Sequence, residues 1–347
     1  MNCKHLIENQ EKIAYANTSS LYPPSWIREP PSSTRLTLRS AVATAPVWSI
    51  ENREPREGLS NRGNAMQVDH ASTRAATFGT DAYLRGTERA AQSVFTAVLE
   101  SVGRQGYASA EELPDDVVLS QDTVRQAWND WFSAASLNQS FDKLSRQDMK
   151  QQFGDLMVRA YSEGGYAAPQ QFLASLSSEE LEVVQHSNRL VDPIDVDSLT
   201  EEGALNLLLP QAAKVDLNHD GFQQTGIAMG MSFPNSDTPP EVVAAWDEAT
   251  AGLDFGDRMF YEMQMMLPML ISNIVTDENG QFVRMIEPGD PDFTNPMASG
   301  NYSYRQAAAD ALEGVEFAKR WMTREQYEEQ RDFWTNFGQL LDKHDAN

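Results

Sequence analysis

A short acidic turn has the residue types and the spacing that could hold a metal cation. Residues 216–221 read DLNHDG, and their oxygen-bearing side chains stand at alternate positions: Asp216, Asn218 and Asp220. Alternation points these oxygens toward the inside of one turn, and Gly221 permits the sharp bend that follows. The main-chain carbonyl of Phe222 can add one more oxygen. The pattern therefore predicts a site for one hard divalent cation.

The turn resembles the first half of the calcium-binding loop of the EF-hand family and related calcium loops of extracellular bacterial modules. The resemblance covers residues 216–227 and implies calcium as the ion. Gln224 stands at the ninth loop position, where it could bind directly or through water. The twelfth position, a bidentate Glu in the family, is Ile227 here. The missing carboxylate could come from Asp237 or Glu241, because three nearby prolines prevent a regular exiting helix.

Two carboxylates and one amide form a ligand set with only two negative charges. Such a set predicts weak calcium binding, on the order of 0.1 to 1 mM, as in extracellular modules. A purely structural interpretation stays open, in which Asp216 and Asn218 organise the turn and cap an adjacent helix.

A second acidic run contains Asp192, Asp195, Asp197, Glu201 and Glu202. We interpret this run as a solvated helix start.

The sequence shows no catalytic signature. The five histidines are scattered along the chain, and the motifs of serine hydrolases, zinc proteases, P-loop proteins and dinucleotide-binding proteins are missing. A non-enzymatic protein is therefore the first interpretation. The alternative is a hydrolase whose carboxylates meet only in the folded chain.

Charge and composition exclude several classes of protein. The 347 residues include 51 acidic and 27 basic side chains, giving a net charge of -24, which disfavours binding to nucleic acid or anionic membranes. The single cysteine, Cys3, excludes a disulfide framework. No signal peptide is visible, and the longest apolar run, Met265 to Ile271, is too short to span a membrane. We therefore expect a soluble protein, cytoplasmic by default.

Residues 1–80 differ from the rest of the chain. They are rich in proline and polar residues and carry a net charge of +2, from nine basic and seven acidic side chains. We expect a largely disordered or extended arm. Its aromatic residues before Phe78 could dock on a protein partner or on the chain's own folded body: Tyr15, Tyr22, Trp26 and Trp48.

The remainder predicts a mainly α fold, an irregular helical bundle with one β-hairpin. We expect one helical subdomain over 81–191 and a second over 192–347 that contains the calcium-type loop. Apolar spacing and capping residues predict helices over 81–103, 120–132, 145–163, 169–176, 178–190, 200–209, 240–250, 254–270, 303–321 and 323–341. Asn279-Gly280 predicts the turn of the hairpin.

The methionine-rich helix over 254–270 has two interpretations. One face would contain residues spaced by three or four: Phe255, Met259, Met263, Met266 and Leu270. A buried core face is the favoured interpretation, and a pliable groove for a partner is the other. Together these features predict an acidic calcium-binding module with a structural or adaptor role.

Overall fold

The computed structural model describes residues 70–135 and 144–347, and only the backbone of residues 70–81. The expected arm therefore lies outside the described residues up to position 69, together with its four aromatic anchors. The described residues other than the turn Glu278–Gly280 belong to one compact unit.

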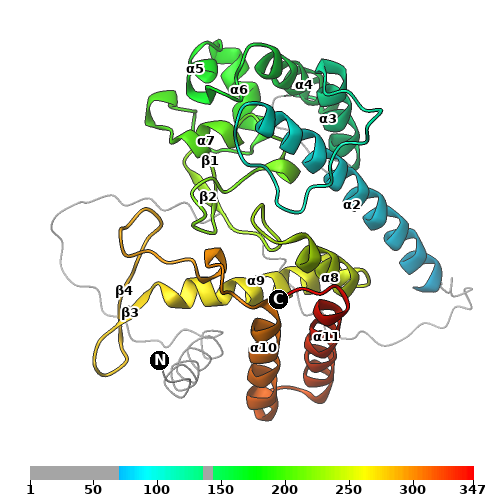
Figure 1. Ribbon diagram of the computed structural model, residues 1–347, viewed down its shortest axis with the longest axis vertical. Helices are drawn as coiled ribbons and strands as arrows, with labels where there is room; N and C mark the ends of the chain where they lie inside the picture. Colours follow the sequence, from blue (N-terminus) through cyan, green and yellow to red (C-terminus); the bar gives the residue numbers. More distant parts are fainter. Residues whose placement is uncertain (1–69, 136–143) are drawn as a thin grey trace, which may run out of the picture. The chain divides into compact units, whose positions relative to one another are not determined.

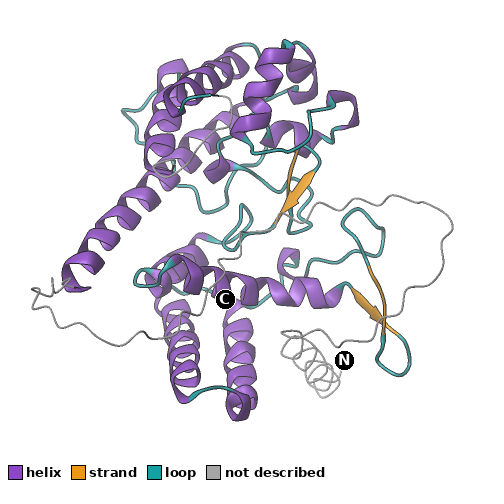
Figure 2. Ribbon diagram, turned by 180° about the vertical axis from the view of Figure 1, so that it is seen from behind, coloured by secondary structure: helices purple, strands orange, loops and turns teal. Residues whose placement is uncertain are grey.

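The expected mainly α fold is confirmed: helices dominate the described residues, and strands are few and short (Figures 1 and 2). The first helices are α2 (His70–Ser101), α3 (Gln121–Ala135), α4 (Arg146–Ser162), α5 (Pro169–Ala174), α6 (Ser178–Ser187) and α7 (Glu201–Asn206). The later helices are α8 (Pro240–Thr250), α9 (Phe255–Ser272), α10 (Tyr304–Ala318) and α11 (Arg324–Lys343). Within the described residues, four short 3-10 helices join them: η1 (Val196–Ser198), η2 (Gln211–Ala213), η3 (Pro296–Ala298) and η4 (Lys319–Trp321).

Local capping explains where most of these helices begin. Ser145 accepts a hydrogen bond from the backbone of Asp148 at the start of α4, and Ser177 and Thr323 form reciprocal capping boxes on α6 and α11. The first helix is an exception. It begins at His70, so the expected start at position 81 is wrong, and the helix occupies part of the region assigned to the arm.

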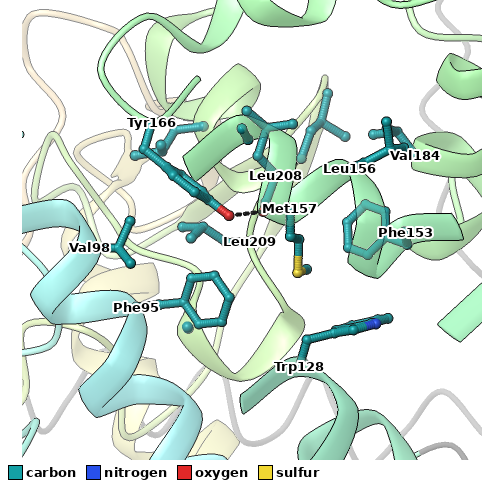
Figure 3. Close-up of a cluster of buried hydrophobic side chains, with 14 of the residues drawn as sticks. Phe95, Val98, Trp128, Phe153, Leu156, Met157, Tyr166, Val184, Leu208 and Leu209 are labelled. Carbon is teal, nitrogen blue, oxygen red and sulfur yellow. Dashed lines mark hydrogen bonds between the residues drawn. The ribbon is translucent and has the colours of Figure 1, made fainter. Parts of the chain in front are cut away.

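The first hydrophobic core packs α2 to α7 around one cluster of buried side chains (Figure 3). Trp128 is a fully buried member of this cluster, with its ring 5.1 Å from that of Phe153 and its indole N–H donating to the Lys150 carbonyl. Tyr166 is also fully buried, and its hydroxyl donates to the Leu208 carbonyl at 3.2 Å (Figure 3). The cluster continues past Asp192 to Val215. The expected division of the chain at Asp192 stays a prediction.

The second hydrophobic core forms around α8, α9, α10 and α11. The aromatic stripe expected on the last helix is buried here: Tyr327, Trp334, Phe337 and Leu341. Trp246 of α8 packs edge-on against Phe337 at 5.3 Å, which joins α8 to α11. The C-terminal end is tied to the same core, because Asn347 accepts a hydrogen bond from the backbone of Tyr304.

Two small hairpins accompany the helices in the part of the chain that the structure describes (orange in Figure 2). The expected hairpin pairs β3 (Ile274–Thr276) with β4 (Phe282–Met285), and Gly280 in its turn has a positive φ of 75°. The other pairs β1 (Gln223–Thr225) with β2 (Ala228–Gly230) and was not expected. It is short and polar at its first strand, so its sequence lacks the apolar alternation that predicts strands.

The methionine-rich helix α9 buries a different face from the one expected. Its buried side chains are Tyr261, Met265, Met266 and Met269. Phe255 is 73% exposed and Met259 is 51% exposed, so the expected core face is wrong apart from Met266 and the half-buried Leu270. The helix has apolar residues of its own around most of its circumference, so their spacing alone does not determine which side faces the core.

None of the helices in residues 70–135 and 144–347 combines the length and the apolar character needed to cross a membrane.

Candidate cation site

The DLNHDG segment forms a tight turn between η2 and β1. His219 and Gly221 both have left-handed backbone conformations, with φ of 59° and 90°. A Cβ at position 221 would also collide with Met269 Sδ, so the site requires glycine for two reasons. The turn thereby packs closely against α9, and Asn295 Nδ2 fixes its other side by donating to the His219 carbonyl at 3.0 Å.

The three predicted side chains lie together in this turn and face its interior amides. Asp216 Oδ2 accepts from Gly221 N at 2.7 Å, and Asp216 Oδ1 accepts from Asp220 N at 3.3 Å. Asn218 Oδ1 also accepts from Asp220 N, at 3.0 Å, while Asn218 Nδ2 donates to Asp220 Oδ2 at 3.0 Å. Asp220 Oδ1 accepts from Phe222 N at 2.8 Å. These bonds organise the turn, and each carboxylate oxygen keeps lone-pair capacity beyond them.

Asp216 is the buried member of this group. Its side chain is 3% exposed, although a charged carboxylate is costly to bury without a compensating positive charge. Burial, with a smaller effect of the negative charges of Asp220, Asp237 and Glu202, raises the pKa of Asp216 to about 7 although the Gly221 amide lowers it. The turn therefore gathers negative charge around an acid that is hard to ionise.

The remaining predicted ligands lie around the turn in different roles. Gln224 is in β1, and its Oε1 accepts from Thr200 Oγ1 at 2.6 Å. Asp237 lies near the turn, where its Oδ2 is 2.8 Å from His219 Nδ1 and raises the pKa of that histidine. Glu241 is exposed in the first turn of α8. Of the two acids considered for the missing carboxylate, Asp237 is the one that contacts the loop.

Glu202 is an important residue that the sequence interpretation missed. We expected it on a solvated helix start, but it is 6% exposed, so that assignment is wrong. Its Oε2 accepts from Leu217 N at 3.0 Å and its Oε1 accepts from Gln224 N at 2.6 Å, which fixes both ends of the loop. Burial raises the pKa of Glu202, and the nearby Asp220 charge adds to the shift. One sequence signal existed: Gly203 allows α7 to approach the Gly226 carbonyl, where a Cβ would clash.

The arrangement offers carboxylate and amide oxygens to a hard cation, with Asp216 and Asp220 as its two turn carboxylates. Among the described residues, no group of three or more His, Cys, Asp or Glu side chains is placed to hold a metal. A cation at this turn would therefore depend on Asn218, on main-chain carbonyls and on water for part of its coordination. The sequence matches no protein-family model, and no curated protein or solved structure is significantly similar to it.

Proposed function

We propose that this chain is a non-enzymatic protein that binds one calcium ion weakly at the 216–224 turn and acts as a structural or interaction module. The observation that supports the proposal is the buried Asp216 carboxylate, whose pKa is raised by burial and by three neighbouring acids. A divalent cation would offset this repulsion and would stabilise the ionised carboxylate. Asp216, Asn218 and Asp220 would hold the ion through side-chain oxygens, with Phe222, Gln224 and Asp237 as further candidates.

The same geometry supports calcium over magnesium and weak over tight binding. Magnesium demands a near-ideal octahedron of short bonds, whereas calcium accepts irregular sets of six to eight oxygens. The turn supplies few charges, and its amide hydrogen bonds already use part of the carboxylate capacity. We therefore expect a dissociation constant on the order of 0.1 to 1 mM.

Calorimetric titration of the full chain with calcium tests this proposal. We expect one binding event in the wild type, weaker binding of magnesium, and loss of at least tenfold in affinity for Asp216→Asn and Asp220→Asn. Asp192→Asn is the matched control, because Asp192 is exposed and lies outside the turn. Absence of binding heat in the wild type, or equal affinities in all variants, would overturn the proposal.

The interaction role is supported by an exposed apolar stripe on α9, formed by Phe255, Met259, Phe260, Met263 and Leu267. Contiguous exposed apolar residues mark interaction surfaces, and flexible methionines adapt to varied partners. Acidic residues begin the helix, at Asp254 and Asp257, in a chain of net charge -24. We therefore propose a basic amphipathic helix as the partner.

The basic amphipathic peptide melittin is a suitable probe for this surface. We expect calorimetry to show binding by the wild type and at least tenfold weaker binding by the double variant Met259→Gln, Met263→Gln. An acidic amphipathic peptide of the same length should not bind. Equal binding by wild type and double variant would show that the stripe is not the docking surface.

A carboxylate-based hydrolase is the second candidate, because Glu88 and Glu262 line one cavity together. Burial raises the pKa of both acids, as a proton donor requires. Arg258 opposes this role, since its Nε lies 3.1 Å from Glu262 Oε1 and its charge lowers the pKa of both. A screen of ester and glycoside substrates with wild type and Glu88→Gln tests it, and activity that Glu88→Gln abolishes would favour the hydrolase.

A further inference from the structure

The cavity of about 500 Å³ that Glu88 and Glu262 line is also lined by residues of the β1–β2 hairpin. Its walls come from α2, α3, α8 and α9, from the hairpin and from the segment that follows η2. Exposed residues of β2, including Met229, form part of its rim, so the cavity is open to solvent at the hairpin. A volume of this size accommodates a small organic molecule.

Lys214 is the unusual residue of this cavity. The residue is 3% exposed and lines the cavity, to which its Nζ stays accessible, and no hydrogen bond or ion pair joins that Nζ to another described residue. Burial lowers the pKa of the Lys214 amine to about 7. Its carbonyl, by contrast, is held by Gln223 Nε2 at 2.9 Å, so the backbone position is fixed. A lysine buried to this extent, with no acidic partner for its amine, is rare in folded proteins and costs free energy when charged.

The other charged residues of the cavity are already compensated. Arg89 pairs with Asp247, and Arg258 pairs with Glu262. Glu88 interacts electrostatically with Arg258 and Arg85. Four basic and three acidic residues line the cavity, so the lining has one positive charge in excess when all seven groups are ionised, in a chain that is strongly negative overall. A ligand with a single negative charge would complete the balance.

A buried donor without a partner lines the same cavity. The Nε1 of Trp131 is buried and has no hydrogen-bond partner among the described residues. Apolar surface is also available in the lining, from Trp246, Leu190 and Met229. We propose that this cavity binds a small organic molecule with one carboxylate and an apolar body, and that the carboxylate pairs with Lys214 Nζ. The carboxylate supplies the acceptor that the buried amine lacks, and the apolar body covers the aromatic and aliphatic wall.

A titration of the full chain with benzoate, indole-3-acetate and octanoate, each beside its neutral primary amide, tests the proposal. We expect at least one carboxylate to bind with one-to-one stoichiometry and at least tenfold more tightly than its amide. Lys214→Met keeps the length and apolar body of the side chain and should reduce carboxylate affinity at least tenfold. Lys343→Met is the matched control, because Lys343 is exposed and pairs with Glu248 on the surface.

Three outcomes would overturn the proposal. They are failure of all three carboxylates to bind at 1 mM, equal affinity for acid and amide, and equal affinity of wild type and Lys214→Met. Displacement of the bound carboxylate by equimolar inorganic phosphate would show that the cavity selects anions generally and would reject the carboxylate assignment. If Lys214→Met does not fold, the comparison of acid with amide on the wild type still decides the matter. Calcium plays no part in these measurements, so they are independent of the proposed function.

Discussion

The carboxyl group of Asp216 couples the proposed calcium site to pH. Its pKa is about 7 in the folded protein, against about 3.9 in an unfolded chain. The folded state therefore holds this proton more tightly, and in calcium-free protein the group lowers the free energy of unfolding as pH rises from about 4 to about 7. Calcium must displace the same proton.

We predict that calcium affinity rises roughly tenfold between pH 6 and pH 8, because one proton with a pKa near 7 is lost over that interval. Calorimetric titrations at pH 6, 7 and 8 measure the change. Proton release, read from buffers with different ionisation enthalpies, should fall as pH rises. A pH-independent affinity would contradict the assignment of Asp216 as a ligand.

Glu202 supports the loop through two hydrogen bonds to backbone amides. Glu202→Gln replaces one acceptor oxygen by a donor, so one buried amide loses its partner. We predict a loss of about 1 to 3 kcal/mol in the free energy of unfolding, measured by urea denaturation. The neighbouring Glu201→Gln should cost at most about 1 kcal/mol, because Glu201 is exposed and makes a surface ion pair with Arg104. Equal losses for the two variants would show that the buried hydrogen bonds of Glu202 stabilise the fold no more than the surface ion pair of Glu201 does.

At the scale of elements, replacing two helical glycines with alanine should change the free energy of unfolding in opposite directions. Gly203 in α7 faces the Gly226 carbonyl so closely that a Cβ would clash with backbone, whereas Gly314 in α10 faces open space. Gly203→Ala should therefore destabilise the protein by about 1 to 3 kcal/mol. Gly314→Ala should stabilise it by up to about 1 kcal/mol, through helix propensity. Denaturation of both variants against wild type checks the pair, and equal signs would contradict the packing of α7 on the hairpin.

Substitutions on the buried and the exposed side of α9 should also differ in their effect on the free energy of unfolding. Met266 is buried in the second core, so Met266→Ala should cost about 2 to 5 kcal/mol. Met259→Gln lies on the exposed stripe and should change stability by less than about 0.5 kcal/mol. Thermal denaturation of the two variants distinguishes the observed face from the one that the sequence suggested. A large loss of stability for Met259→Gln would contradict the exposed position of Met259 and would favour the core face that the sequence predicted.

Sequence reasoning succeeded where a few neighbouring residues decide the structure. The starts of α4, α6 and α11 follow from caps at Ser145, Ser177 and Thr323, and the β3–β4 turn follows from Asn279-Gly280. It failed where tertiary packing decides. The buried side of α9, the short β1–β2 hairpin and the burial of Glu202 depend on contacts between distant segments.

The residues of the candidate site also separate into those that neighbouring sequence predicts and those that only tertiary packing brings together. Asp216, Asn218 and Asp220 were predictable, because they share one turn and their alternation is visible in the sequence. The contact of Asp237 with His219 was anticipated only as a fold-back of the chain. Lys214 carries no such signal, since its burial arises from helices that lie more than a hundred residues apart.

At the scale of the whole molecule, ligand binding to the folded state must raise its stability. With a dissociation constant of 0.1 to 1 mM, 10 mM calcium should add about 1 to 3 kcal/mol to the free energy of unfolding. Differential scanning calorimetry with calcium, and with sodium chloride at the same ionic strength, separates this effect from screening of the net charge of -24. An equal shift in both salts would indicate screening alone.

The two hydrogen bonds from Glu202 have a consequence for signalling. Because they clamp both ends of the loop in the calcium-free chain, the ion would enter a seat that is already shaped and would leave little rearrangement behind. Calcium bound at the proposed site would therefore stabilise the fold and would cause little conformational change.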